Sequence, residues 1–145
     1  MVSGEFQHNI DKKGRMFIPS KFREELGEKL MVCKGLDGKP CLFVYSMEAW
    51  NILDEKIQSM PMAKSIKLQR FIYSGAAEVE CDGQGRILLP ANLRAYANLE
   101  SGATVVGMSR RAEIWNPDSW NEESKECTAE SAFNLMEELG IYRNS

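Results

Sequence analysis

Arg15 and Arg86 are the side chains of this 145-residue chain with the clearest potential for chemistry on a partner. A guanidinium presents its N–H donors in a fixed fork, so it can hold a phosphate or pair with the O6 and N7 atoms of guanine. Each arginine follows an Asp-x-x-Gly turn, whose turn-forming residues are Asp11 and Gly14 in the first case and Asp82 and Gly85 in the second. A structural ion pair between each arginine and its own turn aspartate is an equally good interpretation, because surface ion pairs are common and contribute little to stability.

Further basic residues surround the two arginines, and most of them lie in the first stretch. Residues 11–23 have a net charge of +4, whereas residues 82–94 have a net charge of +1. Basic side chains around a recognition motif contact phosphates, which fixes position rather than sequence choice. The candidates for this role are Lys12, Lys13, Lys21, Arg23 and Arg94. Gly83 and Gln84 stand where the two turn lysines would be in the second stretch, so we expect the first stretch to supply more electrostatic affinity. A solvated turn and helix surface is the alternative.

The two stretches are copies of one motif. Residues 11–23 recur as residues 82–94, displaced by 71 positions, with the same residue at five places. Farther along, the spacing of Tyr45 and Trp50 recurs at a displacement of 70 in Trp115 and Trp120. The chain is therefore predicted to be two copies of one unit, each with the order strand, turn, strand, helix, strand, strand. Equivalence of the copies places the two motif arginines on the same face.

Local sequence chemistry supports this order. Residues 5–10 alternate, which predicts a half-buried strand with His8 on its apolar side as a packed histidine. In the turn, an Asp at the first position can accept a hydrogen bond from the backbone two residues on, and a Gly at the fourth position tolerates a positive φ. Pro19 ends the return strand and begins a short helix, which Gly27 ends. The remaining strands are predicted at 31–34, 41–45, 77–81, 86–89, 104–108 and 113–115.

Helices are expected to connect and extend the two copies. Ser46 is predicted to cap a helix that buries Trp50 and Ile57, and Thr128 is predicted to cap a last helix whose apolar side faces inward. The intervening helix, at 62–73, carries a basic stripe of Lys64, Lys67 and Arg70. The predicted organisation is a first repeat with its trailing helix at residues 1–60, a linking helix at 61–76, a second repeat at 77–125, and a C-terminal helix and tail at 126–145.

Composition excludes several classes of protein. With 43% hydrophobic and 27% charged residues, the chain is an ordinary globular domain, and it contains neither a run of about 18 apolar residues nor the layout of a signal peptide. The four cysteines include no C-x-x-C pair and there is one histidine, so we expect no metal site and no cofactor. Neither a nucleophile with a base nor a phosphate-binding loop stands out, so we expect no enzyme.

The repeated motif resembles the MraZ family of bacterial transcriptional regulators: Asp-x-x-Gly-Arg, an apolar triplet, Pro and a short helix, twice in a chain of this length. The resemblance covers most of residues 1–125 and includes the stretches 4–8, 70–76 and 113–115. It implies an α+β fold in which two tandem copies of a swapped-hairpin βαβ-type unit, as in AbrB and SpoVT-type regulators, form one small double-psi-like barrel with peripheral helices.

The resemblance also implies a function. Members of this family are DNA-binding regulators that form homo-oligomeric rings and bind short direct repeats upstream of genes for cell division and cell-wall synthesis. Arg15 and Arg86 match the arginines that the family uses toward DNA. We therefore expect double-stranded DNA and further copies of the chain as partners, with no membrane and no small-molecule substrate, and a cytoplasmic, nucleoid-associated location.

Two other classes remain open. The first is an antitoxin-type interaction module on the same fold, which would cover a toxin with its C-terminal helix, since residues 113–145 have a net charge of −6. The second is an enzyme on a related small barrel, although no catalytic pair can be placed. The overall charge of −3 is unusual for a nucleic-acid binder, so an affinity for DNA would have to come from one basic face.

Overall fold

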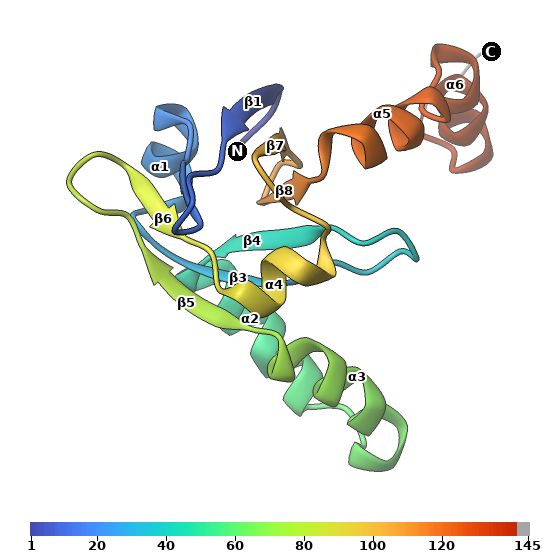
Figure 1. The fold of residues 1–145 in the computed structure, drawn as a ribbon. Coiled ribbons are helices and arrows are strands. Elements are labelled where there is room, and N and C mark those ends of the chain that lie inside the picture. The colour runs from blue at the N-terminus through green and yellow to red at the C-terminus, as the bar shows by residue number, and fades with distance from the viewer. Residues whose placement is uncertain (142–145) are drawn as a thin grey trace.

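Eight strands and six helices form over residues 1–141, which are the residues that the structure, a computed structural model, describes (Figure 1). The strands are β1 (Glu5–Asn9), β2 (Arg15–Phe17), β3 (Lys29–Lys34), β4 (Leu42–Ser46), β5 (Ala77–Glu80), β6 (Arg86–Leu88), β7 (Gly102–Gly107) and β8 (Arg111–Trp115). The helices are α1 (Ser20–Leu26), α2 (Met47–Gln58), α3 (Met62–Ser74), α4 (Ala91–Tyr96), α5 (Pro117–Lys125) and α6 (Ala129–Glu138). This mixture of helices and antiparallel strands confirms the α+β class.

Both copies of the motif have the predicted order of elements. The first copy contributes β1, β2, α1, β3 and β4, and the second contributes β5, β6, α4, β7 and β8. The strands then pair across the copies, because β1 pairs with β7, β5 with β3, and β2 with β6, all antiparallel. Each copy therefore needs the other to complete its sheets.

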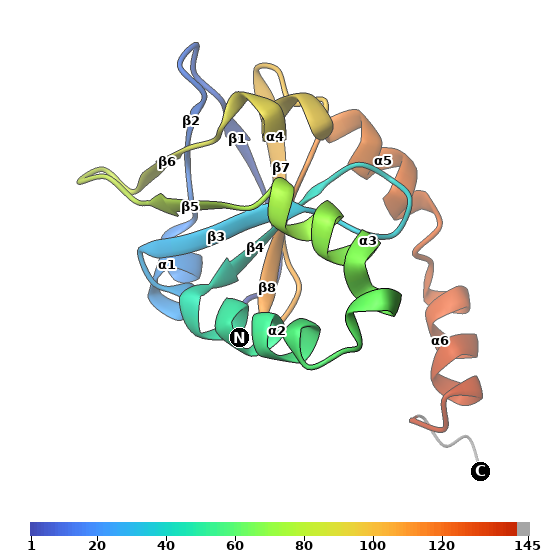
Figure 2. The ribbon, with the colours of Figure 1, turned by 90° about the horizontal axis from the view of Figure 1, so that it is seen from below.

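The strands form one open sheet and one small ribbon. Six of them lie in the order β1-β7-β8-β4-β3-β5, while β2 and β6 form a separate two-stranded sheet, which we call the β2–β6 ribbon (Figure 2). In the part of the chain that the structure describes, β1 and β5 are the edges of the larger sheet and do not pair with each other. The strands therefore do not form a closed barrel, because β2 and β6 pair with one another and not with β1 or β5, and the expected double-psi-like arrangement is not confirmed.

Buried apolar side chains attach the β2–β6 ribbon to the body of the protein. Met16 of β2 and Ile87 of β6 are each 1% exposed, and they share a core cluster with Phe22 of α1 and Leu93 of α4. Full burial of one such side chain stabilises the fold by roughly 1.5–3 kcal/mol. Packing thus fixes the inner face of the ribbon and leaves its outer face to solvent.

Helices α2 and α3 cover a second apolar cluster on the larger sheet. Ser46 Oγ accepts the backbone N–H of Ala49 at 3.0 Å, so α2 begins at its predicted cap. Trp50 and Ile57 of α2 are buried, as predicted, and Ile72 of α3 packs in the same cluster. The two helices lie away from the ribbon, on the opposite side of the sheet in Figure 1.

Helix α6 begins as predicted but does not face inward. Thr128 Oγ1 accepts the N–H of Ser131 at 3.1 Å, which confirms the cap. No residue of α6 is buried, and Met136 and Leu139 are 42% and 69% exposed. The periodicity of the sequence thus predicted an apolar side of the helix correctly, but the predicted inward orientation of Met136 and Leu139 was wrong. The last four residues of the expected tail, 142–145, lie outside the described residues.

Candidate functional site

The first Asp-x-x-Gly turn has the geometry that its sequence predicts. Asp11 Oδ1 accepts the backbone N–H groups of Lys13 and Arg15, both at 2.9 Å. Gly14 takes a φ of +90°, a left-handed conformation that favours glycine. These hydrogen bonds to the carboxylate, foremost the one from Arg15 N–H, lower the pKa of Asp11 from 3.8 to about 2.

The second turn repeats the first in detail. Asp82 Oδ1 accepts the backbone N–H groups of Gln84 and Arg86, again both at 2.9 Å, and Gly85 has a φ of +84°. The hydrogen bond from Arg86 N–H is the main cause of a lowered pKa of Asp82. Both turns therefore present their arginine from the same rigid backbone conformation.

Each arginine is held by its aspartate through one nitrogen. Arg15 Nε donates to Asp11 Oδ2 at 2.7 Å, and Arg86 Nε donates to Asp82 Oδ2 at 2.9 Å. The terminal nitrogens of both guanidinium groups make no hydrogen bond to any residue in the range 1–141. The structural ion pair is thus present, and it is compatible with a contact to a partner, because the aspartate fixes the guanidinium and leaves the outer edge open.

Strand register places both arginines on the outer face of the β2–β6 ribbon. Arg15 lies opposite Leu88, and Phe17 lies opposite Arg86. Because alternate residues of a strand point to opposite faces, all four side chains share the face away from the core. This is the arrangement that the internal repeat predicts, with each arginine beside an apolar residue of the other copy.

Phe17 and Leu88 are site residues that the sequence interpretation missed. They are 45% and 55% exposed on the ribbon, although their neighbours Met16 and Ile87 are buried. The sequence contained the information needed to find them, because a strand whose middle residue is buried must expose the residues on either side of it.

A hollow of about 480 Å³ lies beside the outer face of the ribbon, and both arginines line it together with Phe17 and His8. The His8 ring lies 6.5 Å from the ring of Phe17, measured between centroids. Partial burial lowers the pKa of His8. This places His8 beside the site as a packed, neutral side chain, in agreement with its expected structural role.

Arg23 and Arg94 lie behind the two turns. The Nε atom of each donates to the backbone carbonyl oxygen five residues earlier, at 3.2 Å for Arg23 and 3.0 Å for Arg94. Each guanidinium also packs on the turn of the opposite copy, since Arg94 lies over Gly14 and Arg23 over Gly85. Both arginines therefore brace the turns, and a contact of their terminal nitrogens with phosphate stays a prediction.

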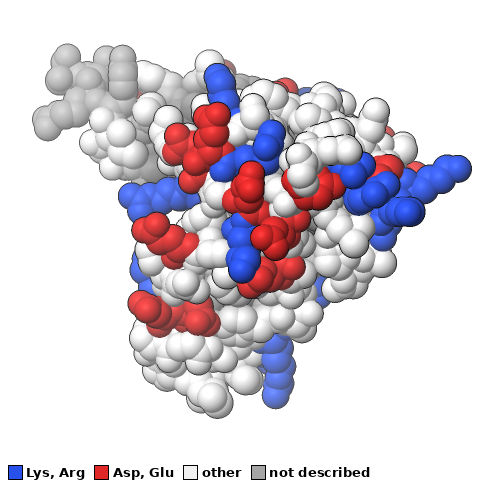
Figure 3. Space-filling model, turned by 90° about the vertical axis from the view of Figure 1, so that its left-hand side faces the viewer, with Lys and Arg blue, Asp and Glu red and all other residues white. Residues whose placement is uncertain are grey.

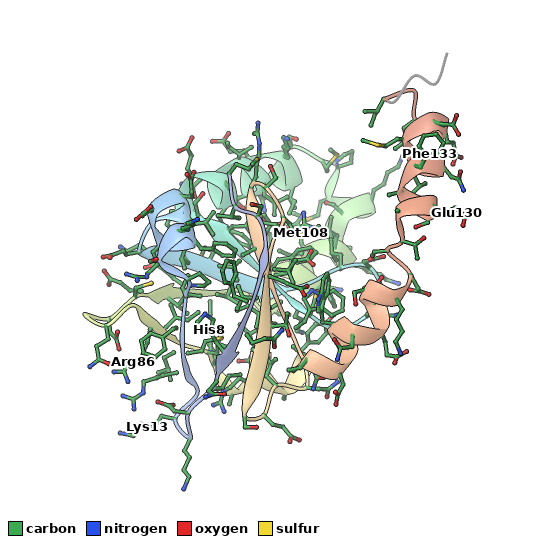
Figure 4. All side chains as sticks on the ribbon, turned by 90° about the horizontal axis from the view of Figure 1, so that it is seen from above. His8, Lys13, Arg86, Met108, Glu130 and Phe133 are labelled. Carbon is green, nitrogen blue, oxygen red and sulfur yellow. The ribbon has the colours of Figure 1, made fainter. Side chains whose placement is uncertain are left out.

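The lysines project from the turns and helix surface around the ribbon. Lys12, Lys13 and Lys21 are exposed and take part in no ion pair in the described part of the chain. Figure 4 shows Lys13 and Arg86 on two neighbouring hairpins, on the side of the molecule away from α6. In Figure 3 acidic and basic side chains are mixed across one face, while basic side chains project together at its right-hand edge. Three exposed cations, Lys12, Lys13 and Lys21, thus lie near the ribbon of a molecule with a net charge of −3.

Other kinds of site find no support in the described residues. Between residues 1 and 141, no three His, Cys, Asp or Glu side chains are grouped so that they could hold a metal ion. No helix among these residues has the length and apolar character needed to cross a membrane.

Comparison with known proteins identifies the family. The family described as "MraZ protein, putative antitoxin-like" matches residues 1–68 and 72–140. The chain is 50% identical to the transcriptional regulator MraZ of Acetivibrio thermocellus, and 46% identical to the proteins of the same name from Alkaliphilus metalliredigens and Caldicellulosiruptor saccharolyticus. Each alignment covers 97% of this chain and 100% of the relative. The chain therefore belongs to the MraZ family.

Proposed function

We propose that this protein is a sequence-specific, DNA-binding transcriptional regulator that acts as a homo-oligomeric ring at short direct repeats upstream of cell-division and cell-wall genes. It would work in the cytoplasm, on the nucleoid. The name of its relatives, transcriptional regulator, supports a regulatory role without catalysis. The pairing of β1 with β7 and of β5 with β3 across the copies supports the description of each unit as a swapped hairpin.

One observation carries the proposal: Arg15 and Arg86 lie on one outward ribbon face, each anchored through Nε with its terminal nitrogens open. A two-stranded ribbon fits the major groove of B-DNA, where a guanidinium can donate to O6 and N7 of guanine. Because the aspartates hold both guanidinium groups in place before binding, little side-chain entropy would be lost on contact.

The surrounding lysines would add affinity that does not depend on sequence. Lys12, Lys13 and Lys21 are exposed around the ribbon, where they can neutralise phosphates and release counterions. A single ribbon covers only a short stretch of DNA. Several copies in a ring would engage repeated sites together, and such linkage raises affinity by about 10² to 10⁴ when the spacing fits.

Operator binding by arginine variants tests the proposal. In a mobility-shift assay with the DNA upstream of the protein's own gene, we expect Arg15→Ala and Arg86→Ala each to weaken binding by about 1–3 kcal/mol per site. Arg110→Ala is the matched control, because Arg110 is an exposed arginine on the turn between β7 and β8 and should leave binding unchanged. Wild-type binding by both ribbon variants would refute the role assigned to the arginines.

An antitoxin-type module is the second candidate, and one observation favours it. Helix α6 exposes its apolar side and carries three glutamates and no basic residue, which would suit the surface of a basic protein. Native mass spectrometry of the protein isolated from its own cells separates the two functions, since a defined heterodimer with a small basic partner would support the antitoxin role.

A further inference from the structure

The outer face of the β2–β6 ribbon alternates charged and apolar side chains. Arg15 lies opposite Leu88 and Phe17 lies opposite Arg86, so each arginine has an apolar neighbour from the other copy. Side chains directly opposite each other on two antiparallel strands are about 4.5–5.5 Å apart at Cβ, and diagonal ones about 7–8 Å apart. The two arginines therefore occupy one diagonal of this face, and Phe17 and Leu88 occupy the other.

The two apolar side chains on this face are exposed although the ribbon does not need them to be apolar. Met16 and Ile87, which attach the ribbon to the core, are each 1% exposed, whereas Phe17 and Leu88 are 45% and 55% exposed. Burial of apolar surface is the main favourable contribution to association. A partner that covers Phe17 and Leu88 would therefore gain affinity from them.

The charges of the ribbon indicate which partner suits these two side chains. The terminal nitrogens of Arg15 and Arg86 are open, and Lys12 and Lys13 are exposed on the first turn. The partner must therefore offer anionic groups and apolar groups within a few ångströms of one another. The major groove of B-DNA does so, because phosphates border it and each thymine presents its methyl group there. The minor groove presents no methyl group.

We propose that Phe17 and Leu88 are specificity-determining residues that contact the methyl groups of two thymines in the major groove. This inference rests on the proposed function and adds two contacts to the bases. Successive bases lie about 3.4 Å apart along the duplex, so two side chains that oppose each other on the ribbon reach neighbouring base pairs. The thymine of Phe17 should therefore lie beside the guanine of Arg86, and the thymine of Leu88 beside the guanine of Arg15.

Phe17 is held in position before any partner binds. Its ring packs against the ring of His8 on β1, with the two ring planes inclined by 43°. The lowered pKa of His8, caused by its partial burial, keeps that neighbour uncharged and apolar in character. A side chain that is already ordered loses little entropy on contact, so most of the gain from covering the ring would appear as affinity.

Removal of the thymine methyl groups tests the contact without any change in the protein. The duplex is the DNA upstream of the protein's own gene, prepared once with thymidine and once with deoxyuridine at every thymine position. Uracil lacks only the methyl group and keeps the same pairing and the same major-groove oxygen. We expect the wild-type protein to bind the thymine duplex more tightly, by about fourfold for each methyl group that a side chain covers.

Alanine variants assign this preference to the two side chains. Phe17→Ala and Leu88→Ala should each reduce the ratio of thymine-duplex to uracil-duplex affinity by about fourfold, and each should weaken binding to the uracil duplex much less. A variant that had lost its fold would bind neither duplex. Leu36→Ala is the matched control, because Leu36 is 43% exposed in the loop between β3 and β4, at the other end of the molecule from the ribbon (Figures 1 and 2). It should keep the full preference.

Single-base changes test the pairing across the copies. One deoxyuridine at a time identifies the thymine whose methyl group affects the wild-type protein but not Phe17→Ala. Replacement of single guanines by 7-deazaguanine, which lacks the N7 acceptor, identifies in the same way the guanine that Arg86→Ala no longer senses. We expect the two positions to be adjacent, because Phe17 lies opposite Arg86. Positions separated by several base pairs would overturn the arrangement.

The remaining outcomes separate this inference from the proposed function. Equal binding of the wild-type protein to both duplexes, with both bound more tightly than an unrelated duplex, would overturn the methyl contacts and leave the proposed function intact. A thymine preference that survives in Phe17→Ala and in Leu88→Ala would assign the methyl effect to other residues and would also overturn the inference. Binding of the thymine duplex no tighter than that of an unrelated duplex would refute the proposed function itself.

Discussion

Arg94 of the second copy lies against Gly14 of the first, so closely that a Cβ atom on Gly14 would come within 2.7 Å of Arg94 Nε. The relationship is reciprocal, because a Cβ on Gly85 would come within 2.7 Å of the Arg23 guanidinium carbon. Each turn is therefore held by an arginine from the other half of the chain. The turn that presents one motif arginine depends on the correct folding of both copies.

Gly14→Ala should destabilise the protein for two reasons. A non-glycine residue in the left-handed region costs about 1–2 kcal/mol, and the added methyl group would also displace Arg94. Gly38→Ala is the matched control, since Gly38 has a φ of +76° but open space around its Cβ position. Urea denaturation should give a larger loss of unfolding free energy for Gly14→Ala, and equal losses would show that the arginine moves aside without cost.

The first turn should make stability depend on pH in the acid range. Folding lowers the pKa of Asp11 from 3.8 to about 2, so its ionised form stabilises the native state above the unfolded pKa. That contribution is lost as the pH falls from about 4 towards 2, where the folded carboxylate protonates. Asp11→Asn removes the titration, so the difference in denaturation midpoint between wild type and variant should shrink over this interval. A difference that is constant from pH 6 to pH 2 would contradict the role of the carboxylate.

The salt dependence of DNA binding should show that the first turn of the ribbon contributes more phosphate contacts than the second. If Lys12 contacts a phosphate, Lys12→Ala should weaken binding to every DNA sequence alike and reduce the slope of log K against log salt by about 0.9. Gly83 occupies the equivalent place in the second turn, and its Cβ position is open and its φ is not left-handed. Gly83→Lys should therefore increase affinity and steepen the slope by a similar amount. An effect confined to one operator base would instead assign Lys12 a base contact.

Thiol reactivity should distinguish Cys127 from the other three cysteines. Burial raises the pKa of Cys33 and of Cys41 to about 12, and it also raises the pKa of Cys81, whereas Cys127 is exposed. A colorimetric thiol reagent should modify one cysteine in the native protein and four after denaturation. Cys127→Ser should abolish the native reaction, and rapid modification of a second thiol would indicate opening of the sheet around Cys33 and Cys41.

The sequence predicted the parts of the site that depend on local chemistry. Asp11 and Gly14 predicted the turn, because that turn depends on short-range spacing, and the internal repeat predicted that the two arginines share a face, because equivalent residues of the two copies take equivalent positions. The packing of Arg94 on Gly14 could not be predicted, since it depends on the pairing of β2 with β6, which spacing does not reveal. The inward orientation of α6 was wrong for a related reason: periodicity shows that Met136 belongs to an apolar side, not what covers it.

The β2–β6 ribbon is built by one chain, so its two halves are free to differ. Two identical chains around a twofold axis would favour a palindromic site, because the symmetry of the protein is mirrored in its DNA. Here Lys12 and Lys13 of one turn correspond to Gly83 and Gln84 of the other, so one end of the ribbon carries two lysines that the other end lacks. A DNA segment bound by such a ribbon would have a defined polarity, and neighbouring copies in the same orientation would recognise sites that all point the same way.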